Sequence, residues 1–500
     1  MRQALHIFKK DVRQLWFEIA ITLIVTAAFA FIGARRGFWL DDPGANRSVA
    51  WSMVQLMLPL AWWILIARVV YGEILPGDRQ FWITRPYRWT SLLGAKLFFI
   101  GVFVNLPLLA ADVIILRAYG FLPGEEMQGL MWKQILCTLV FLLPVAAICA
   151  ITTGFVQLLS VGFVLLVGML VWNVVIPGIP PSATGGVLDW VAIYYVFLVA
   201  ALAAFTILIW QYAKRKTWAN RAVAFAAAIV ALAGGALIPW TSAFAIQSRL
   251  SQGRVNGSSM QVVFDSDRKW LARARLDGDD GRVQLELPLR INGIPDGMKA
   301  KPIGLVMAIE SPDGVVWQAP GRPWMQVSPE SDLVSLQAGV DGSVYRRVKD
   351  KPAKIRGTLY LTLYGNRRTT RIPFQGRPVA VASLGLCSAS RVTHGQMYFL
   401  LCSSAFRSEP DLVSVHFVEL GKNTFREVSP YIAPKRPSYS PFPADLDISP
   451  VSQYFTFATV RGELSDVVID SLEPLGHVQR QFELDGLRLG EFEVNPAAHQ

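Results

Sequence analysis

The sequence predicts a membrane protein in two parts, an all-α polytopic helical bundle followed by an all-β, sandwich-like part outside the membrane. Hydrophobic residues make up 52% of the 500 residues and charged residues only 17%, which is too apolar for an ordinary soluble protein. Nearly all of the apolar excess lies before about residue 245, in stretches long enough to cross a bilayer. After residue 247, apolar and polar residues alternate instead, which is the pattern of half-buried strands.

Residues 1–16 predict a helix that lies along the membrane surface. Apolar residues recur at helical spacing in this segment, and basic residues occupy the opposite side. The apolar set is Leu5, Phe8, Val12, Leu15 and Trp16, and the basic set is Lys9, Lys10 and Arg13. Such an amphipathic pattern is typical of an interfacial helix rather than of a span.

Seven stretches of about 20 mainly apolar residues predict membrane spans. They are residues 16–34, 51–71, 95–116, 133–153, 155–176, 191–212 and 222–245. The 55 residues from Gln134 to Leu188 include no charged side chain, which is too long a stretch for one helix, so we divide it at the turn sequence 152–154. We therefore expect a six-span domain over residues 17–221 and a seventh span over 222–246.

The distribution of Lys and Arg predicts the orientation of these spans, because cytoplasmic loops carry an excess of basic residues. Up to residue 245 the chain has 18 Lys and Arg against 10 Asp and Glu. With the N-terminus in the cytoplasm, the inner segments hold twelve basic residues and the outer loops five, which are Arg35, Arg36, Arg47, Arg117 and Lys133. An odd number of spans then places the β part on the extracytoplasmic side of the cell membrane.

The β part is predicted to form two modules, over residues 247–375 and 376–500, joined near Gly376. In the first, apolar residues alternate with polar ones at Val283, Leu285, Leu287, Leu289 and Ile291. In the second, Val413, Val415 and Phe417 alternate in the same way, so His416 is expected to be an exposed strand residue on the opposite face.

The second module also contains two of the four cysteines, Cys387 and Cys402. Two strands around a turn near residues 393–396 would bring them together, and an extracytoplasmic compartment permits a disulfide. Cys137 and Cys149 belong to the fourth span, where a small apolar role is expected. No metal site is predicted, because the cysteines and histidines lack the spacing of metal ligands.

The sequence contains no motif of an ATP-binding or hydrolytic enzyme. Neither G-x-x-x-x-G-K-[ST] nor G-x-S-x-G occurs, so we expect a chain that is not an enzyme and binds no cofactor. The basic residues that produce the net charge of +11 cluster beside the spans in the first half of the chain. That placement suits lipid headgroups and does not predict nucleic-acid binding.

Polar side chains inside a span are costly and therefore mark candidate functional sites. Asn105 and Asp112 lie seven residues apart in the third span, and hence on one helix face. Asp112 has a structural alternative, an ion pair with Arg117 at the outer mouth.

Three charged residues lie at the predicted inner ends of the first two spans. Glu18 is expected to face lipid headgroups or Arg13. Arg68 and Glu73 are five residues apart and are expected to pair with each other or with a partner protein.

Between the second and third spans lies a basic, aromatic segment, residues 72–96, with the sequence GEILPGDRQFWITRPYRWTSLLGAK. It is too long for a tight turn, and its two prolines divide it into short pieces. The composition suits a short amphipathic helix at the cytoplasmic membrane surface. A structural alternative is a simple belt of Trp, Tyr and Arg at the level of the headgroups.

This segment resembles the permease subunits of type-2 ABC transporters. In that family the second span ends in Glu, an LPGxRxFWxxRP stretch follows, and a sLLxaKL sequence opens the third span. The matching residues here are Glu73, Leu75-Pro76-Gly77, Arg79, Phe81-Trp82, Arg85-Pro86 and Leu92 to Lys96. The strict match covers about 25 residues, and the span layout extends it over roughly the first 245.

The resemblance implies a permease without a nucleotide-binding site, coupled to two copies of a separate ABC ATPase subunit that uses ATP. The ATPase would dock on Glu73, Arg79, Phe81, Trp82, Arg85, Pro86 and Lys96. A second permease subunit, identical or related, and membrane lipids would be the other partners. The alternative from another class is a membrane-anchored sensor or envelope assembly factor whose β part binds a partner. A membrane-embedded enzyme is a third possibility, but the sequence offers no cluster of His, Asp and Glu for it.

Overall fold

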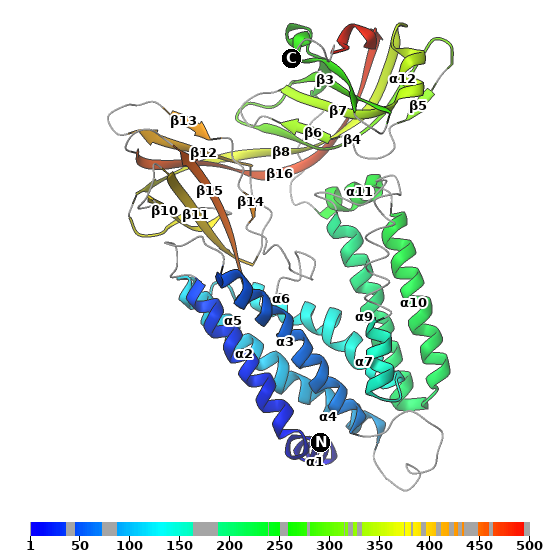
Figure 1. Ribbon diagram of the computed structural model, residues 1–500, viewed down its shortest axis with the longest axis vertical. Helices are drawn as coiled ribbons and strands as arrows, with labels where there is room; N and C mark the ends of the chain where they lie inside the picture. Colours follow the sequence, from blue (N-terminus) through cyan, green and yellow to red (C-terminus); the bar gives the residue numbers. More distant parts are fainter. Residues whose placement is uncertain are drawn as a thin grey trace.

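The protein consists of a bundle of long helices with a β-rich region at one end (Figure 1). The computed structural model describes residues 2–36, 46–72, 88–163, 189–238, 240–250, 259–277, 281–314, 316–318, 324–327, 333–374, 376–381, 384–391, 397–406, 412–419, 425–428, 433–434, 449–459 and 464–494. We call the end of the bundle next to the β region β-proximal. The opposite end, at which α1 lies, is called β-distal (Figure 1).

Six helical stretches in the described residues are long and apolar enough to cross a membrane: Trp16–Arg35, Ala50–Tyr71, Trp89–Ala118, Met127–Ile151, Val191–Lys214 and Thr217–Gly235. The helices are α1 (Arg2–Gln14), α2 (Trp16–Arg36), α3 (Asn46–Tyr71), α4 (Trp89–Ile100), α5 (Leu106–Ala118), α6 (Met127–Cys137), α7 (Leu143–Ile151), α9 (Asp189–Lys214), α10 (Thr217–Leu237) and α11 (Trp240–Leu250). Residues 155–163 are also helical. The prediction of a helical part suited to a membrane, followed by a β-rich part, is thus confirmed.

The fifth predicted span, residues 155–176, lies mostly outside the described residues. The chain nevertheless changes ends of the bundle between α7 and α9. Ile151 accepts hydrogen bonds from Arg221 at the β-distal end, whereas Val191 packs with Phe244 and Tyr360 of the β-proximal end. The seven-span count stays a prediction.

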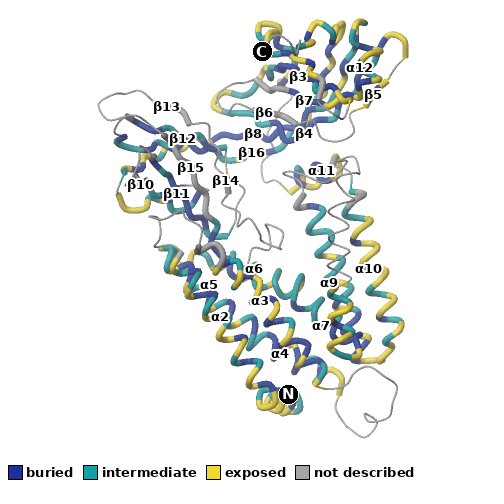
Figure 2. Tube along the Cα trace, in the orientation of Figure 1, coloured by how far each residue is buried: buried dark blue, intermediate teal, exposed yellow. Residues whose placement is uncertain are grey.

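The first helices pack closely through aromatic residues and one glycine. The rings of Phe29 and Trp51 stack with their centroids 5.1 Å apart, which joins α2 to α3. Gly33 lies against Ile115 of α5, and a Cβ at this position would be only 2.7 Å from the isoleucine side chain. Small residues of this kind allow helices to approach in a membrane. In contrast, α10 exposes much of its length (Figure 2), including Trp218 and Phe225.

The described residues of the β region form three antiparallel sheets. Their strands are β1 (Gln261–Phe264), β2 (Arg273–Asp277), β3 (Arg282–Asn292), β4 (Lys299–Glu310), β5 (Val316–Gln318), β6 (Trp324–Val327), β7 (Leu333–Asp341), β8 (Ala353–Pro373), β9 (Val379–Val381), β10 (Gly385–Arg391), β11 (Met397–Ala405), β12 (Leu412–Glu419), β13 (Phe425–Val428), β14 (Ala433–Pro434), β15 (Val451–Thr459) and β16 (Leu464–Leu487). The short helix α12 (Gly342–Val348) follows β7. The strand orders are β1-β3-β7-β6 with β2 beside β3, β14-β15-β11-β10-β9, and β13-β12-β16-β8-β4-β5.

Two long strands, β8 of 21 residues and β16 of 24 residues, run through both halves of the β region. One core forms where β3 and β7 face β4, β8 and β16, and it buries the five alternating residues from Val283 to Ile291 as predicted. A second core forms where β10 and β11 face β12, β8 and β16. Phe482 and Phe492 come after residue 376 in the sequence but belong to the first core, so the two halves of the β region are not consecutive segments divided at residue 376. The last strand, β16, contributes to both halves.

Two of the contacts between the β region and the bundle involve aromatic side chains of the described residues. Phe406, which follows β11, packs its ring directly against Gly129 of α6 and leaves no room for a side chain there. Elsewhere, Phe244 of α11 lies edge-on to Tyr360 of β8, with ring centroids 4.7 Å apart. The neighbouring His477 of β16 lies 3.2 Å from the amide of Gln247 and 3.0 Å from the hydroxyl of Thr362. Burial at this contact lowers the pKa of His477, which favours the neutral imidazole.

Cys387 and Cys402 lie directly opposite each other on β10 and β11 and form a disulfide. Both side chains are buried in the second β core. The turn predicted near residues 393–396 lies outside the described residues. Cys137 and Cys149 are free thiols of the helical part.

We predict that the denatured protein has two thiols open to a maleimide reagent before reduction and four after it, counted by mass spectrometry. Denaturation is needed because the bonded cysteines are buried. A Cys387→Ser variant should show three thiols without reductant. Replacing both cysteines with Ser should cost on the order of 2–4 kcal/mol of unfolding free energy. Four reactive thiols in the unreduced wild type would show that the bond is absent.

Candidate functional site

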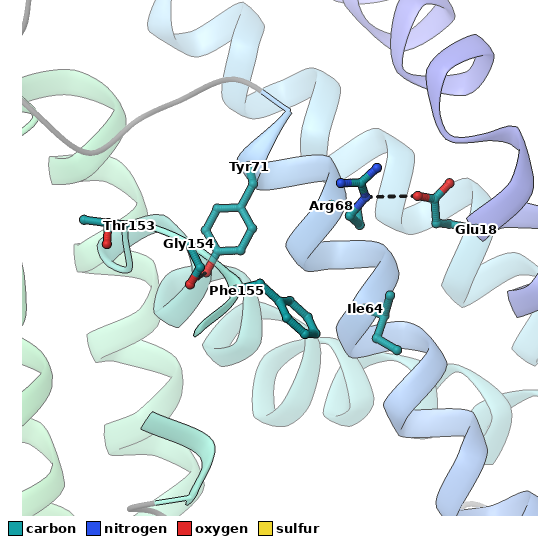
Figure 3. A pocket seen from close by; sticks show the side chains of 7 residues that line it. All are labelled: Glu18, Ile64, Arg68, Tyr71, Thr153, Gly154 and Phe155. Atoms are coloured by element: carbon teal, nitrogen blue, oxygen red, sulfur yellow. Dashed lines mark hydrogen bonds and ion pairs between the residues drawn. The ribbon is translucent and has the colours of Figure 1, made fainter. Parts of the chain in front are cut away.

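A cavity of about 510 Å³ opens at the β-distal end of the bundle. Figure 3 shows its walls, which come from α2, α3 and the turn after α7. The lining residues are Glu18, Ile64, Arg68, Tyr71, Thr153, Gly154 and Phe155. Charged and hydrogen-bonding groups thus share this cavity with exposed apolar side chains.

The charged side of the cavity is an ion pair between the first two long helices. The Nε of Arg68 lies 3.0 Å from Oε1 of Glu18, and the two side chains point toward each other in Figure 3. The Arg68 side chain is 57% exposed, so the pair contributes no more than about 1 kcal/mol of stability. Glu18 therefore pairs with Arg68 of α3 rather than with Arg13, and its position relative to the headgroups stays a prediction. Glu73, the expected partner of Arg68, lies outside the described residues.

Tyr71, the last residue of α3, connects this helix to the turn after α7. Its hydroxyl lies 2.5 Å from the hydroxyl of Thr152 and 3.3 Å from the carbonyl oxygen of Gly154. The next residue, Gly72, still donates its N–H to the carbonyl of Arg68. The cavity therefore borders the point at which the basic, aromatic segment leaves the bundle.

Most of that segment lies outside the described residues, including Glu73, Arg79, Phe81, Trp82, Arg85 and Pro86. Its last predicted docking residue, Lys96, is described and belongs to α4. The ammonium of Lys96 lies 2.8 Å from Oδ2 of Asp11 of α1, and both side chains are less than 5% exposed. Lys96 thus contacts α1 rather than the surface, which corrects its place among the expected docking residues.

The pair between Asp11 and Lys96 positions α1 on the bundle. Ile7 and Asp11 are one helical turn apart and form the buried face of α1. Phe8 beside them stacks on Phe103, with ring centroids 5.9 Å apart. Leu5 and Trp16 of the predicted apolar face are exposed instead. Because α4 begins inside the basic, aromatic segment, at Trp89, and Lys96 is the last residue of that segment, this ion pair links the segment to α1.

A second polar site lies within the long helices, at the predicted residues Asn105 and Asp112. The amide of Asn105 donates to the hydroxyl of Thr138 at 2.9 Å, and Oδ1 of Asp112 lies 2.7 Å from the ammonium of Lys133. As their spacing predicts, both residues face the same neighbouring helix. The alternative pairing of Asp112 with Arg117 is wrong, because the partner of Asp112 is Lys133. This lysine lies inside α6 rather than in an outer loop.

Both helices widen at this site into one π-helical turn, over Gly101–Asn105 and over Thr138–Leu142. Each turn is followed by a proline, Pro107 in α5 and Pro144 in α7. Proline has no N–H to donate and crowds the preceding turn, and the wider turn accommodates it. The hydrogen bond between Asn105 and Thr138 therefore joins two irregular turns, where the helices bend most easily.

This site has hydrogen-bonding capacity that the described residues do not use. Oδ1 of Asn105, Oδ2 of Asp112 and the side-chain amide of Gln134 are buried and have no hydrogen-bond partner among them. Polar atoms without partners are costly in hydrocarbon, so the arrangement favours a functional role over a purely structural one. The sequence did not indicate Gln134 and Lys133 as site residues, because they lie at the N-terminal end of the fourth predicted span, where polar residues are ordinary.

No protein-family model matches this chain, and no curated protein sequence matches it. Within the described ranges, no three His, Cys, Asp or Glu side chains are grouped so that they could hold a metal ion. The two polar sites of the bundle are therefore candidates on their geometry alone.

We predict that removing one charge of the Asp11–Lys96 pair destabilises the protein far more than removing both charges together. Lys96→Met leaves a buried carboxylate without its partner, which should cost about 3–5 kcal/mol of stability. The double variant Asp11→Leu/Lys96→Met should recover most of that loss, because both charges are gone. Thermal unfolding in detergent measures the series. Lys9→Met, an exposed change on the same helix, is the control. A Lys96→Met variant as stable as Lys9→Met would contradict the role of the pair.

Proposed function

We propose that this chain is the membrane permease subunit of an ABC-type exporter that is powered by a separate ATPase subunit. The observation that carries the proposal is the sequence of residues 72–96, with its LPG, FW and RP elements before the helix α4, whose first turns contain Leu92 and Leu93. Tyr71, which precedes this segment, and Trp89, which lies within it, belong to α3 and α4, the helices that meet the cavity and α1 at the β-distal end. A docking surface between them would be reached from that side of the membrane.

The partners in this proposal are two ATPase subunits and a second permease subunit, identical or related, in the cell membrane. The ATPase would bind Arg79, Trp82 and the residues around them, with aromatic side chains as anchors and arginines as polar contacts. ATP is bound and hydrolysed by the partner, and this chain contributes no catalytic group. The N-terminus is cytoplasmic and the β region extracytoplasmic, as the twelve basic residues of the inner segments and five of the outer loops indicate.

The proposed mechanism has two parts: a lever, in which α1 and α4 move together at the β-distal end, and a bend of the helices within the spans. Closure of the ATPase subunits moves residues 72–96, and the Asp11–Lys96 ion pair carries α1 along with α4. The motion reaches the π-helical turns around Asn105 and Thr138, where α5 and α7 change their tilt. Alternation between inward- and outward-facing arrangements follows from such helix shifts.

A second candidate function is a membrane-anchored sensor or envelope assembly factor. The observation that favours it is the direct contact of the β region with α6 through Phe406 and with α11 through Tyr360. A partner bound to the β region would move these helices without any transport. Purification in mild detergent separates the two functions, because the permease should retain an ATPase subunit and the sensor an extracytoplasmic protein.

We predict that Trp82→Ala/Arg85→Ala weakens binding of the ATPase subunit at least about tenfold, as expected when an aromatic and an arginine anchor are truncated. ATP hydrolysis coupled to the permease should fall with it. Expression should stay near that of the wild type, because both residues lie outside the predicted spans. The matched control is Trp270→Ala/Arg268→Ala, which removes an exposed Trp and Arg from the β region. Equal ATPase binding by both double variants would refute the docking surface.

A reporter that is active only in the cytoplasm gives the orientation. We predict activity when it is inserted between α9 and α10, after Lys216, and none when it is fused after Gln500. The reason is the Lys and Arg bias at Lys214, Arg215 and Lys216 combined with the odd span count. Activity at both positions would place the β region in the cytoplasm and remove the exporter topology.

A further inference from the structure

A second cavity, of about 320 Å³, lies in the β region, away from the two sites of the bundle. It is lined by Lys299, Arg367, Ser414, His416, Asp470 and Leu472. These residues come from β4, β8, β12 and β16, which are the four central strands of the six-stranded sheet. The strands β8 and β16 pass here from one β core to the other (Figure 1).

The cavity forms because the regular pairing of these strands is interrupted. The register between β8 and β16 shifts between Ser471 and Glu473 and again between Pro474 and Gly476. Asn366, beside the cavity, has a positive φ of 52°, which a non-glycine residue adopts mainly in turns and bulges. Bulges bend a strand and redirect its side chains, so groups from both halves of the β region converge at this place.

The wall of the cavity is the sheet face that points away from the second β core. Val413, Val415 and Phe417 face that core, so Ser414 and His416 on the same strand face the cavity. His416 was expected to be exposed, yet its side chain is only 14% exposed, because the cavity wall surrounds it. The alternation in the sequence predicted correctly that His416 lies on the face of β12 opposite the core, but it could not predict which side chains surround it there.

Asp470 is held in place by the surrounding side chains and does not titrate freely. Its carboxylate accepts hydrogen bonds from Nη2 of Arg367 at 2.6 Å and from the hydroxyl of Thr369. Burial acts to raise the pKa of Asp470, but these hydrogen bonds outweigh it and lower the pKa below the usual value. Asp470 therefore stays ionised, fixes the orientation of Arg367 and neutralises one positive charge.

Beside Asp470, the cavity is lined by cationic and hydrogen-bonding side chains. Arg367 uses Nη2 for Asp470, a guanidinium has five N–H groups, and 63% of this side chain is exposed. Lys299 adds an ammonium, and Ser414 and His416 add further hydrogen-bonding atoms. A planar guanidinium held in this way suits the two oxygens of a carboxylate or phosphate group. Leu472 is the one apolar side chain among the described residues that line the cavity, and this polar lining does not suit an acyl chain.

We propose that this cavity binds the phosphate or carboxylate group of a small water-soluble molecule, with Arg367 and Lys299 as its cationic contacts. The site is separate from the ATPase-docking segment, and its test does not depend on the permease function. An extracytoplasmic β region with such a site would recognise an anionic solute before or during transport.

The test is thermal unfolding of the full chain in detergent at constant pH, titrated with inorganic phosphate and, separately, with acetate. Chloride at matched ionic strength is the reference. A ligand that binds the folded protein raises the midpoint of unfolding in a saturable way. We expect this for the wild type with at least one of the two anions.

Three variants locate the binding. Arg367→Gln should raise the half-saturating anion concentration at least about tenfold, because it removes one charged contact and such a contact changes the affinity by about a factor of ten. Lys299→Gln should weaken binding by a similar factor while it leaves the hydrogen bond between Arg367 and Asp470 intact, so it remains informative if Arg367→Gln fails to fold. Arg368→Gln is the matched control, because this neighbour pairs with Glu473 and does not line the cavity.

Two results would overturn the proposal. One is a shift of equal size in the wild type and in Lys299→Gln, because the general salting effect of phosphate stabilises every variant alike. The other is the absence of a saturable shift with both anions. A shift that Lys299→Gln loses and Arg368→Gln keeps supports it.

Discussion

Hydrocarbon offers no hydrogen-bond partner, and this constraint determines where the polar side chains of the helical part lie. Among the described residues of the helices, each buried charge pairs with an opposite charge on another helix: Lys96 with Asp11 of α1, and Lys133 with Asp112 of α5. A buried pair contributes little net stability but is costly to break, so it fixes which helix lies beside which. The two pairs therefore act as specific links, one at the β-distal end and one inside the spans. The proposed lever and bend both depend on them.

The β region obeys a different constraint, since its stability comes from two apolar cores that share strands. Because β8 and β16 belong to both cores, neither half can rotate freely relative to the other. The same two strands carry Tyr360 and His477, which contact α11, so the sheet and α11 are mechanically joined. A ligand in the cavity at the strand bulges would thus act on strands that continue to the bundle contact.

The sequence predicted what depends on local pattern and missed what depends on neighbours. Apolar stretches located the long helices, and alternation located β3 and β12, because both signals follow from periodicity along the chain. The partner of Lys96 is 85 positions away, so no local pattern could identify it, and a lysine at the start of a span was taken as exposed. Asp112 was paired with the nearest arginine in the sequence for the same reason. The anion cavity was missed because its six lining residues come from four strands that only the fold brings together.

The position of β16 also has a consequence for how the chain folds during its synthesis. Both β cores lack a central strand until residues 464–487 have been made, although the first strand begins at Gln261. The edges of β8 and β12 that pair with β16 must therefore wait until then, and pairing between strands far apart in the sequence is slow. Exposed edges of this kind invite pairing with other chains. Biogenesis of this protein thus has a late, cooperative step, and a chaperone that shields strand edges would act in the interval before it.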